Sequence, residues 1–143
     1  MCGKIKIRLL QLSDFEQISM LWHSVPGVGL RQWDDSEAGI ATFLKRNPTT
    51  CFVAERDGRV LGCMLSGNDG RRGFIYHATV QIGMHNHGIG KAMLTEVLLS
   101  LRAEGIRKVN LVCFIENEKG QDFWKSQGFS FRRDLTYMEK EIK

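Results

Sequence analysis

The feature that most constrains this fold is a helical segment between two strand-like segments. Apolar side chains recur at helical spacing from Gly88 to Glu104, and Gly105 follows where a helix C-cap is expected. Residues 74–82 before this helix and 108–115 after it have the apolar or alternating pattern of strands. Because a crossover helix joins strands that run in the same direction, these two strands are predicted to be parallel neighbours in one sheet.

The other strands are predicted to be antiparallel. Cys51–Glu55 and Arg59–Leu65 are apolar runs joined by Asp57-Gly58, a dipeptide typical of a two-residue hairpin. A second turn, Gly67–Gly73, is rich in glycine, asparagine and aspartate and leads into the strand that precedes the crossover helix. Near the start of the chain, basic and aliphatic residues alternate over residues 4–9, which predicts a strand with one face in water.

Two helices are predicted between the first strand and the hairpin. One begins at a capping box that starts with Ser13, and the other begins at Asp34-Asp35. A short helix at 121–126 and one or two strands within 129–142 complete the chain. The predicted fold is α/β, with a mixed, largely antiparallel central sheet in the order β-α-α-β-β-β-α-β-α-β and helices on both faces.

Size and composition favour a single domain over residues 1–143. The chain is 43% hydrophobic and 25% charged, which is typical of a globular protein with a buried core. No apolar stretch approaches the ~20 residues of a membrane span, and the charged, alternating start does not resemble a signal peptide. We therefore expect a cytoplasmic protein that does not use a membrane as a partner.

The charge and the cysteines exclude several kinds of site. The net charge is +4, but no run of basic residues exceeds two, so a small anion is a better expected partner than nucleic acid. The four cysteines show no C-x-x-C spacing and are expected to be reduced thiols; they are Cys2, Cys51, Cys63 and Cys113. His85 and His87 have no nearby cysteine or carboxylate, so no metal site is expected.

The segment Val80–Leu94 carries the predicted chemistry. A strand ends, a loop follows, and a helix begins at Gly88 and Gly90. The first amides of a helix lack internal partners and carry partial positive charge, and glycine lets an anion approach them closely. A Walker loop would need glycine at His85 and a dinucleotide fingerprint would need it at Met93, so neither fits. The pattern predicts a phosphate-binding turn of another kind.

This segment and residues further along resemble the GNAT superfamily of acetyl-CoA-dependent N-acetyltransferases, in its small stand-alone form. The family's phosphate loop, Arg/Gln-x-x-Gly-x-Gly/Ala, aligns with His85–Gly90, and its later signature aligns with Asn117 and Phe123–Phe129. The resemblance covers nearly the whole chain in element order. It implies transfer of an acetyl group from acetyl-CoA to a primary amine by direct attack. The alternative on the same fold is a non-catalytic CoA-binding regulator.

The resemblance also implies the contacts of the coenzyme. It places main-chain groups of Val80 and Ile82, and the side chain of Asn117, against the pantetheine arm. The amides that it places on the pyrophosphate belong to His87, Gly88, Ile89, Gly90, Lys91 and Ala92.

Two residues depart from the family pattern. His85 stands where arginine or glutamine is usual, and Trp124 stands where a tyrosine often protonates the departing thiolate. Because backbone amides do most of the binding in that loop, the phosphate site is expected to survive the first change. Since an indole N–H is not an acid near neutral pH, Trp124 is expected to pack beside the thioester instead.

Three polar residues are expected nearest the acceptor amine and are the candidate catalytic groups: Tyr76, Asp34 and Asp35. Tyr76 and Val80 are four residues apart in a predicted strand, so their side chains are expected on one face. The resemblance makes the loop with Asp34 and Asp35 the place where the acceptor enters, and the carboxylates suit a cationic amine. One of the two is alternatively the helix N-cap.

Neighbouring residues receive other roles. His77 is expected to point to the opposite face from Tyr76 and to pack there, while Glu55 is kept as an alternative base. The expected partner is a small-molecule amine or a peptide amine, with a homodimer as an option. The sequence does not specify which amine is acetylated.

Overall fold

The computed structural model describes residues 3–142, apart from the side chain of Asn86. The chain divides into two compact units, one up to Val112 and one from Cys113 onward. The first unit holds a five-stranded sheet and three helices, and the second holds one helix and the C-terminal segment. The strands are β1 (Lys6–Leu9), β2 (Phe52–Arg56), β3 (Arg59–Asn68), β4 (Gly73–Val80) and β5 (Val109–Asn110). The helices are α1 (Phe15–Ser24), α2 (Glu37–Arg46), α3 (Ile89–Ala103) and α4 (Glu118–Ser126).

The sheet follows chain order, β1-β2-β3-β4-β5. β1 to β4 are antiparallel neighbours, and β4 pairs parallel with β5 across the crossover helix α3, as predicted. The hairpin between β2 and β3 turns at Asp57 and Gly58, whose φ angles of 52° and 80° are those of the predicted two-residue turn. The mixed α/β sheet expected from the sequence is thus confirmed.

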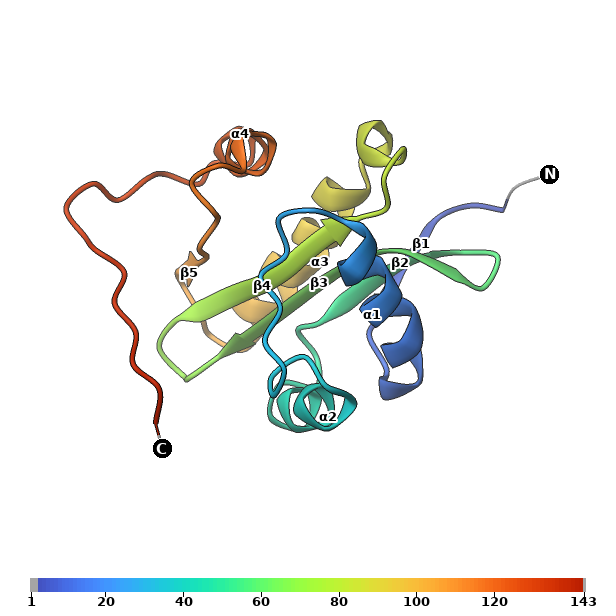
Figure 1. The fold of residues 1–143 in the computed structure, drawn as a ribbon, viewed down its shortest axis with the longest axis horizontal. Coiled ribbons are helices and arrows are strands. Elements are labelled where there is room, and N and C mark those ends of the chain that lie inside the picture. Colours follow the sequence, from blue (N-terminus) through green and yellow to red (C-terminus); the bar gives the residue numbers. More distant parts are fainter. Residues whose placement is uncertain (1–2, 143) are drawn as a thin grey trace. The chain divides into compact units, whose positions relative to one another are not determined.

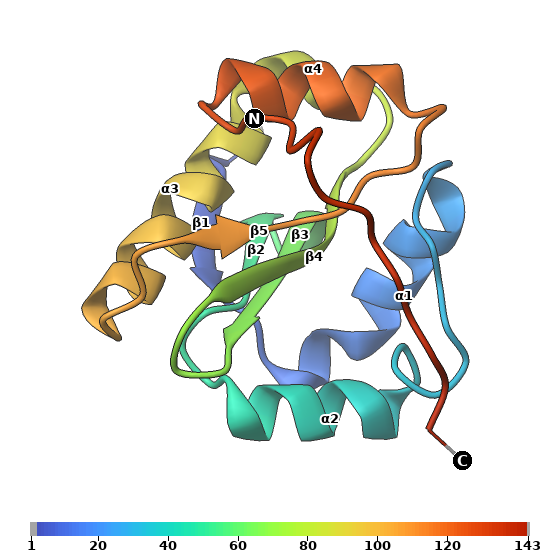
Figure 2. The ribbon, with the colours of Figure 1, turned by 90° about the vertical axis from the view of Figure 1, so that its left-hand side faces the viewer.

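The helices cover the two faces of the sheet, with α1 and α2 on one side and α3 on the other (Figures 1 and 2). On the α1 side, apolar side chains of α1 and α2 pack on apolar side chains of β2 and β3. The helices contribute Ile18, Leu21, Trp22 and Ile40, and the strands contribute Val53, Cys63 and Leu65. On the other side, α3 buries an apolar stripe made of Ile89, Met93, Leu94, Val97 and Leu101. Side chains on both faces of β3 are therefore buried, and the core spans the sheet.

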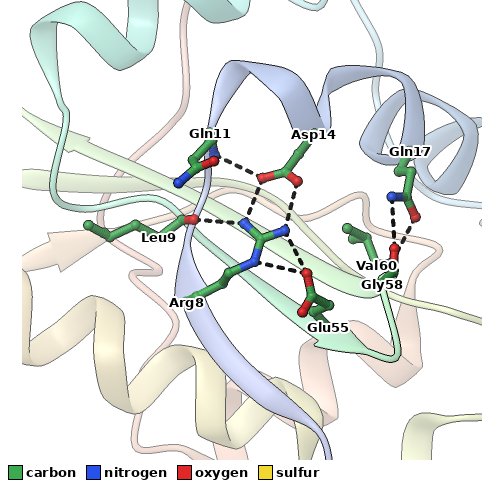
Figure 3. Close-up of polar contacts among 8 residues, drawn as sticks. All are labelled: Arg8, Leu9, Gln11, Asp14, Gln17, Glu55, Gly58 and Val60. Carbon is green, nitrogen blue, oxygen red and sulfur yellow. Dashed lines mark hydrogen bonds and ion pairs between the residues drawn. The ribbon is translucent and has the colours of Figure 1, made fainter.

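A network of hydrogen bonds ties β1 to β2 and to the start of α1 (Figure 3). Arg8 donates to both carboxylate oxygens of Asp14, at 2.9 and 2.8 Å, and to Glu55 at 3.1 and 3.0 Å. Asp14 also accepts the backbone N–H of Gln11, at 2.9 Å. The predicted capping box at Ser13 is therefore wrong, because a 3₁₀ turn over Leu12–Asp14 precedes α1 and Asp14 reaches back to Gln11.

Three further boundaries differ from the sequence prediction. α2 begins at Glu37 with Ser36 as its cap, so neither Asp34 nor Asp35 is the N-cap. β5 is limited to Val109–Asn110, and residues 127–142 contain no strand. Alternation alone therefore overestimated strand content after α3, where the residues find few pairing partners.

Cys51, Cys63 and Cys113 are free thiols, as predicted, whereas Cys2 lies outside the described residues. Burial raises the pKa of the Cys51 thiol to about 12, in spite of its contact with the carbonyl of Ser66. Within residues 3–142, no helix is long and apolar enough to cross a bilayer, and no three metal-ligating side chains are grouped together.

Candidate active site

The start of α3 presents backbone N–H groups that the helix itself does not use. The chain leaves β4, passes Gly83 at φ 91°, makes a 3₁₀ turn over His85–His87, and enters α3 through Gly88 at φ 71°. A left-handed conformation of this kind favours glycine. Among the side chains that the structure describes, none caps α3, and no acidic residue stands in its first turn. The positive end of the helix dipole is thus left available to an anion.

The first hydrogen bond within α3 shows which of the amides predicted to bind phosphate are already used by the helix. The amide of Ala92 donates to the carbonyl of Gly88, at 3.0 Å. Ile89, Gly90 and Lys91 precede that bond, so their amides have no partner within the helix. Ala92 therefore leaves the predicted phosphate-binding set, whose remaining members lie between His87 and Lys91. Nothing lies within 4 Å of where a side chain at Gly88 would begin, so the space beside this glycine is open.

β4 has a long edge that no strand covers. It pairs with β5 only through Gly73 and Phe74, although it continues to Val80. Within the described first unit, residues 75–80 therefore present backbone groups on the side facing away from β3. Val80 ends this edge, and Ile82 just beyond it has a side chain that is 61% exposed. This is the edge that leads directly into the loop before α3.

An extra residue in β4 changes the direction of its side chains. Cys63 of β3 pairs with Thr79 and Leu65 pairs with Tyr76, so three residues of β3 face four of β4. The extra residue forms a β-bulge at His77, whose φ is 48°. Such an angle is uncommon for a residue other than glycine, although histidine adopts it more often than most.

The bulge places Tyr76 and Val80 on opposite faces of the sheet. Val80 pairs with Gly62, where a side chain would begin 2.9 Å from Met93 of α3. Tyr76 instead faces α2, with its ring centroid 5.8 Å from that of Phe43. The prediction that Tyr76 and Val80 share a face is therefore wrong, because it assumed unbroken alternation.

His77 and Asp35 form an ion-pair geometry between β4 and the loop that joins α1 to α2. His77 Nε2 lies 2.7 Å from Asp35 Oδ1, and the side chains are 14% and 9% exposed. The imidazole also meets Trp22 of α1 edge to face, with centroids 5.0 Å apart. His77 thus lies on the same helix-covered side as Tyr76 and does not point away from it. The sequence prediction for His77 is corrected on this point, for the same reason as above.

Asp35 is also fixed by its own loop. Its Oδ2 accepts the backbone N–H of Arg31 at 2.6 Å, and its own N–H donates to the carbonyl of Arg31 at 2.9 Å. Ser36 donates to the carbonyl of Trp33 at 2.8 Å, and a Cβ at Gly39 would overlap that carbonyl. Asp34, by contrast, is exposed. Of the two candidate aspartates, the structure brings Asp35 to the strand and leaves Asp34 at the surface.

Glu55, the alternative base, lies elsewhere. Its carboxylate accepts two of the hydrogen bonds that Arg8 donates in the network of Figure 3. It belongs to β2, which β3 separates from β4. The structure therefore brings Asp35, and not Glu55, to His77, a residue for which the sequence predicts only packing. No signal in a single sequence marks a β-bulge at a histidine.

The second unit carries the two other predicted coenzyme contacts. Asn117 caps α4, with its Oδ1 accepting the N–H of Gly120 at 3.0 Å. Trp124 lies on the same helix and packs edge to face on Phe123 and Phe129, with centroids 4.9 and 5.1 Å away. Its indole is therefore held by aromatic neighbours, as expected of a packing residue.

Comparison with known proteins decides the family. Residues 12–129 match the family model described as "Acetyltransferase (GNAT) family". This chain belongs to the GNAT family of acetyltransferases. A curated acetyltransferase of Sodalis glossinidius (strain morsitans) is 33% identical over 138 residues, which cover 96% of each chain.

Solved structures share the GNAT fold. Ard1 from Thermoplasma volcanium matches with a TM-score of 0.80 at 19% identity, over 90% of this chain and 84% of that one. Diaminobutyrate acetyltransferase EctA from Paenibacillus lautus, in complex with L-2,4-diaminobutyric acid and coenzyme A, matches with a TM-score of 0.73 at 19% identity. That match covers 87% of this chain and 75% of that one.

These matches confirm the family expected from residues 80–129, and with it the activity. As a GNAT acetyltransferase, the chain transfers an acetyl group from acetyl-CoA to an amine. The family leaves the acceptor open.

Proposed function

We propose that the start of α3 binds the diphosphate of acetyl-CoA and that the acetyl group passes to a cationic primary amine. The observation that carries this proposal is the uncapped start of α3, where the space beside Gly88 is open and the amides of Ile89, Gly90 and Lys91 have no partner within the helix. The absence of an acidic residue in that first turn favours an anion further. The side chain of Lys91 adds a cation in the same turn.

The pantetheine arm is proposed to lie along the uncovered edge of β4. A chain of amides needs backbone partners in an extended row, and residues 75–80 offer one. Val80 and the nearby Ile82 are the closest of these positions to the phosphate loop. Asn117 uses its Oδ1 to cap α4, so its NH₂ group is the part left to donate to the arm. Trp124 contributes an apolar surface for the thioester end.

Both compact units are proposed to act as one acetyltransferase domain over residues 1–143. The family match supports this, because residues 12–129 run from the first unit into the second. The proposed phosphate loop lies in the first unit, and Asn117 and Trp124 lie in the second.

The acceptor is proposed to enter beside the loop between α1 and α2. Trp33 is 78% exposed there, next to the exposed carboxylate of Asp34. An aromatic face and a carboxylate together suit a cationic amine, free or on a peptide. EctA, which has the same fold, was solved with a diamine. Tyr76, half-exposed on the same side of the sheet, is proposed to orient the water that leads the amine's proton away.

The chemistry then needs little from the protein beyond position and charge. The neutral amine attacks the thioester carbonyl, and a backbone N–H on the uncovered edge of β4 is proposed to stabilise the oxyanion. Holding the two substrates in line removes much of the entropic cost of their encounter. The carbon–sulfur bond then breaks, and the CoA thiolate leaves.

Calorimetric titration tests the coenzyme site directly. Acetyl-CoA should bind far more tightly than S-acetylpantetheine, which has the same thioester but lacks the diphosphate. If the two bind equally well, the start of α3 does not hold the diphosphate and the proposed site is wrong.

A further inference from the structure

We propose that His77 is the general base that takes the proton from the acceptor amine, with Asp35 as its positioning residue. This inference rests on the proposed function, because it uses the course of the coenzyme along β4. It goes beyond that function by assigning the proton transfer to a residue that the family resemblance did not mark. The proposal depends on three features: the hydrogen bond to Asp35, the bulge, and the location of His77 on β4.

The hydrogen bond determines which nitrogen of His77 is available. An ionised carboxylate only accepts hydrogen bonds, so the 2.7 Å contact with Asp35 Oδ1 requires a proton on Nε2. In the neutral imidazole, Nδ1 then carries the free lone pair. Within residues 3–142, the imidazole of His77 makes one hydrogen bond, from Nε2 to Asp35, and one ring contact, with Trp22, so Nδ1 has no hydrogen-bond partner there. Asp35 is the charged side chain in contact with this ring.

The carboxylate is itself held in place. Asp35 Oδ2 accepts the N–H of Arg31, which leaves Oδ1 for the imidazole. Asp35 therefore orients the ring and stabilises the imidazolium that forms when Nδ1 takes a proton. A histidine that only filled space would not need a carboxylate that is 9% exposed and fixed by its own backbone.

The bulge gives a second, independent reason. A φ of 48° is unfavourable for a residue other than glycine. Strain of this kind persists where the surrounding structure enforces it, and it is concentrated at functional sites. Here it turns the imidazole to the side of α1 and α2, where the proposed acceptor loop lies.

The order of the chemical groups along acetyl-CoA, from diphosphate through pantetheine arm to thioester, places the thioester near the imidazole of His77. The diphosphate is proposed to lie after Val80, at the start of α3, and the pantetheine arm runs back along the uncovered edge of β4. The acetyl end of the molecule is therefore carried toward the earlier residues of the edge. His77 lies three positions before Val80 on that edge.

His77 Nδ1 takes one proton from the ammonium group, either directly or through one water, and passes it to solvent. The freed lone pair of the amine then forms the carbon–nitrogen bond. The nitrogen of the tetrahedral intermediate gives its second proton to Nδ1, and the carbon–sulfur bond breaks with its electron pair on sulfur. The imidazolium returns that proton to the thiolate, which restores the neutral base.

Three variants test the proposal, with Asp69→Asn as a matched control. His77→Asn keeps a residue that tolerates positive φ but cannot take a proton. Asp35→Asn removes the charge that orients the ring. Asp69 is also an aspartate that accepts backbone N–H groups, from Arg71 and Arg72, but it lies in the turn at the start of β4. Its change should leave turnover unaltered.

Turnover is measured by thiol release, with the fastest amine from a panel of 2,4-diaminobutyrate, spermidine, lysine and a peptide amine. His77→Asn should lower kcat by ~10²–10⁴ and remove the acidic limb of the pH–rate profile, with calorimetric affinity for acetyl-CoA unchanged. Asp35→Asn should show part of that loss. If His77→Asn keeps the parent's kcat and pH profile, the inference is wrong.

A fourth variant, His77→Gly, keeps the test decisive if the His77→Asn protein does not fold. His77→Gly fits the positive φ and leaves room for free imidazole. Added imidazole should restore its turnover, and a folded His77→Gly protein that imidazole does not rescue would contradict the role of His77. Failure of the proposed function is distinguished by the parent protein, which would then show no preference for acetyl-CoA over S-acetylpantetheine.

Discussion

Tyr76 and Val80 lie on opposite faces of β4, although an even number of positions, four, separates them. The bulge at His77 turns Tyr76 toward Phe43 of α2 and leaves Val80 opposite Gly62, on the side of α3. One strand therefore serves both substrates of the proposed reaction. Its α3 side leads to the proposed phosphate loop, and its α2 side faces the loop proposed to admit the acceptor.

Tyr76→Phe should lower turnover by about tenfold or less. The phenyl ring keeps the contacts with Phe74 and Phe43, and a phenol hydroxyl is a poor proton acceptor. The change should therefore remove only the orientation of a water molecule, near or below the lower end of what acid–base groups supply. Steady-state kinetics with a saturating amine measure this. A loss of a thousandfold in a folded variant would make Tyr76, and not His77, the principal proton acceptor.

Gly88→Trp should abolish acetyl-CoA binding, because the indole would fill the open space beside the first amides of α3. The substitution also strains a residue at φ 71°, so it needs a control with the same strain. Gly58→Trp provides it, since Gly58 has φ 80° and equally open surroundings in the β2–β3 turn. Calorimetry should show lost affinity in the first variant and retained affinity in the second. Equal affinity in both would remove Gly88 from the site.

Trp124→Phe should keep most of the activity. A phenyl ring can still pack on Phe123 and Phe129, and the indole N–H has no acid role to lose. Trp124→Tyr should raise kcat if its hydroxyl reaches the departing sulfur. Rates of thiol release with saturating substrates test both variants. Collapse of kcat in a folded Trp124→Phe protein, with coenzyme affinity intact, would show a role beyond packing.

Asp14 should make stability depend on pH. Burial alone would raise the pKa of Asp14, but hydrogen bonds from Arg8 and from the N–H of Gln11 outweigh it and hold the pKa below its usual value. A lowered folded-state pKa stabilises the protein above the unfolded pKa, near 4, and this contribution is lost as the pH falls through the folded value. Asp14→Asn should therefore cost about 1.5–3 kcal/mol at pH 7 and much less in acid.

Urea denaturation at pH 7 and at pH 3 measures this effect. Asp134→Asn is the matched control, because Asp134 also pairs with an arginine, Arg132, but both side chains are largely exposed. Its change should leave the free energy of unfolding close to that of the parent. An Asp14→Asn protein that matches the parent at pH 7 would show that the network in Figure 3 does not stabilise the fold.

Much of the fold could be predicted from local sequence patterns, in the segments where the local preference and the tertiary structure agree. The Asp57-Gly58 turn, the crossover helix and the parallel pair it joins each depend on residues that are close in sequence. The loop before α3 and the helix start at Gly88 were predictable for the same reason, whereas the use of the Ala92 amide inside the helix was not. What depended on distant partners was not predictable.

The acceptor side shows this limit most clearly. The bulge at His77 depends on the register between β3 and β4, and a one-residue change reverses every side chain after it. The pairing of His77 with Asp35 joins residues 42 positions apart. Neither the bulge nor this contact can be predicted from the spacing of residues in a single sequence. The error at residues 129–142 has a different origin. Their pattern predicts strands, but in the structure these residues do not pair with a neighbouring strand.

The most direct test of the account is mass spectrometry of amines incubated with acetyl-CoA and the purified chain. The account predicts that at least one cationic primary amine gains one acetyl group on nitrogen, in step with release of one CoA thiol. A chain that binds acetyl-CoA through α3 yet forms no acetyl amide with any amine of a broad panel would contradict it. The protein would then be a non-catalytic CoA-binding regulator on the same fold.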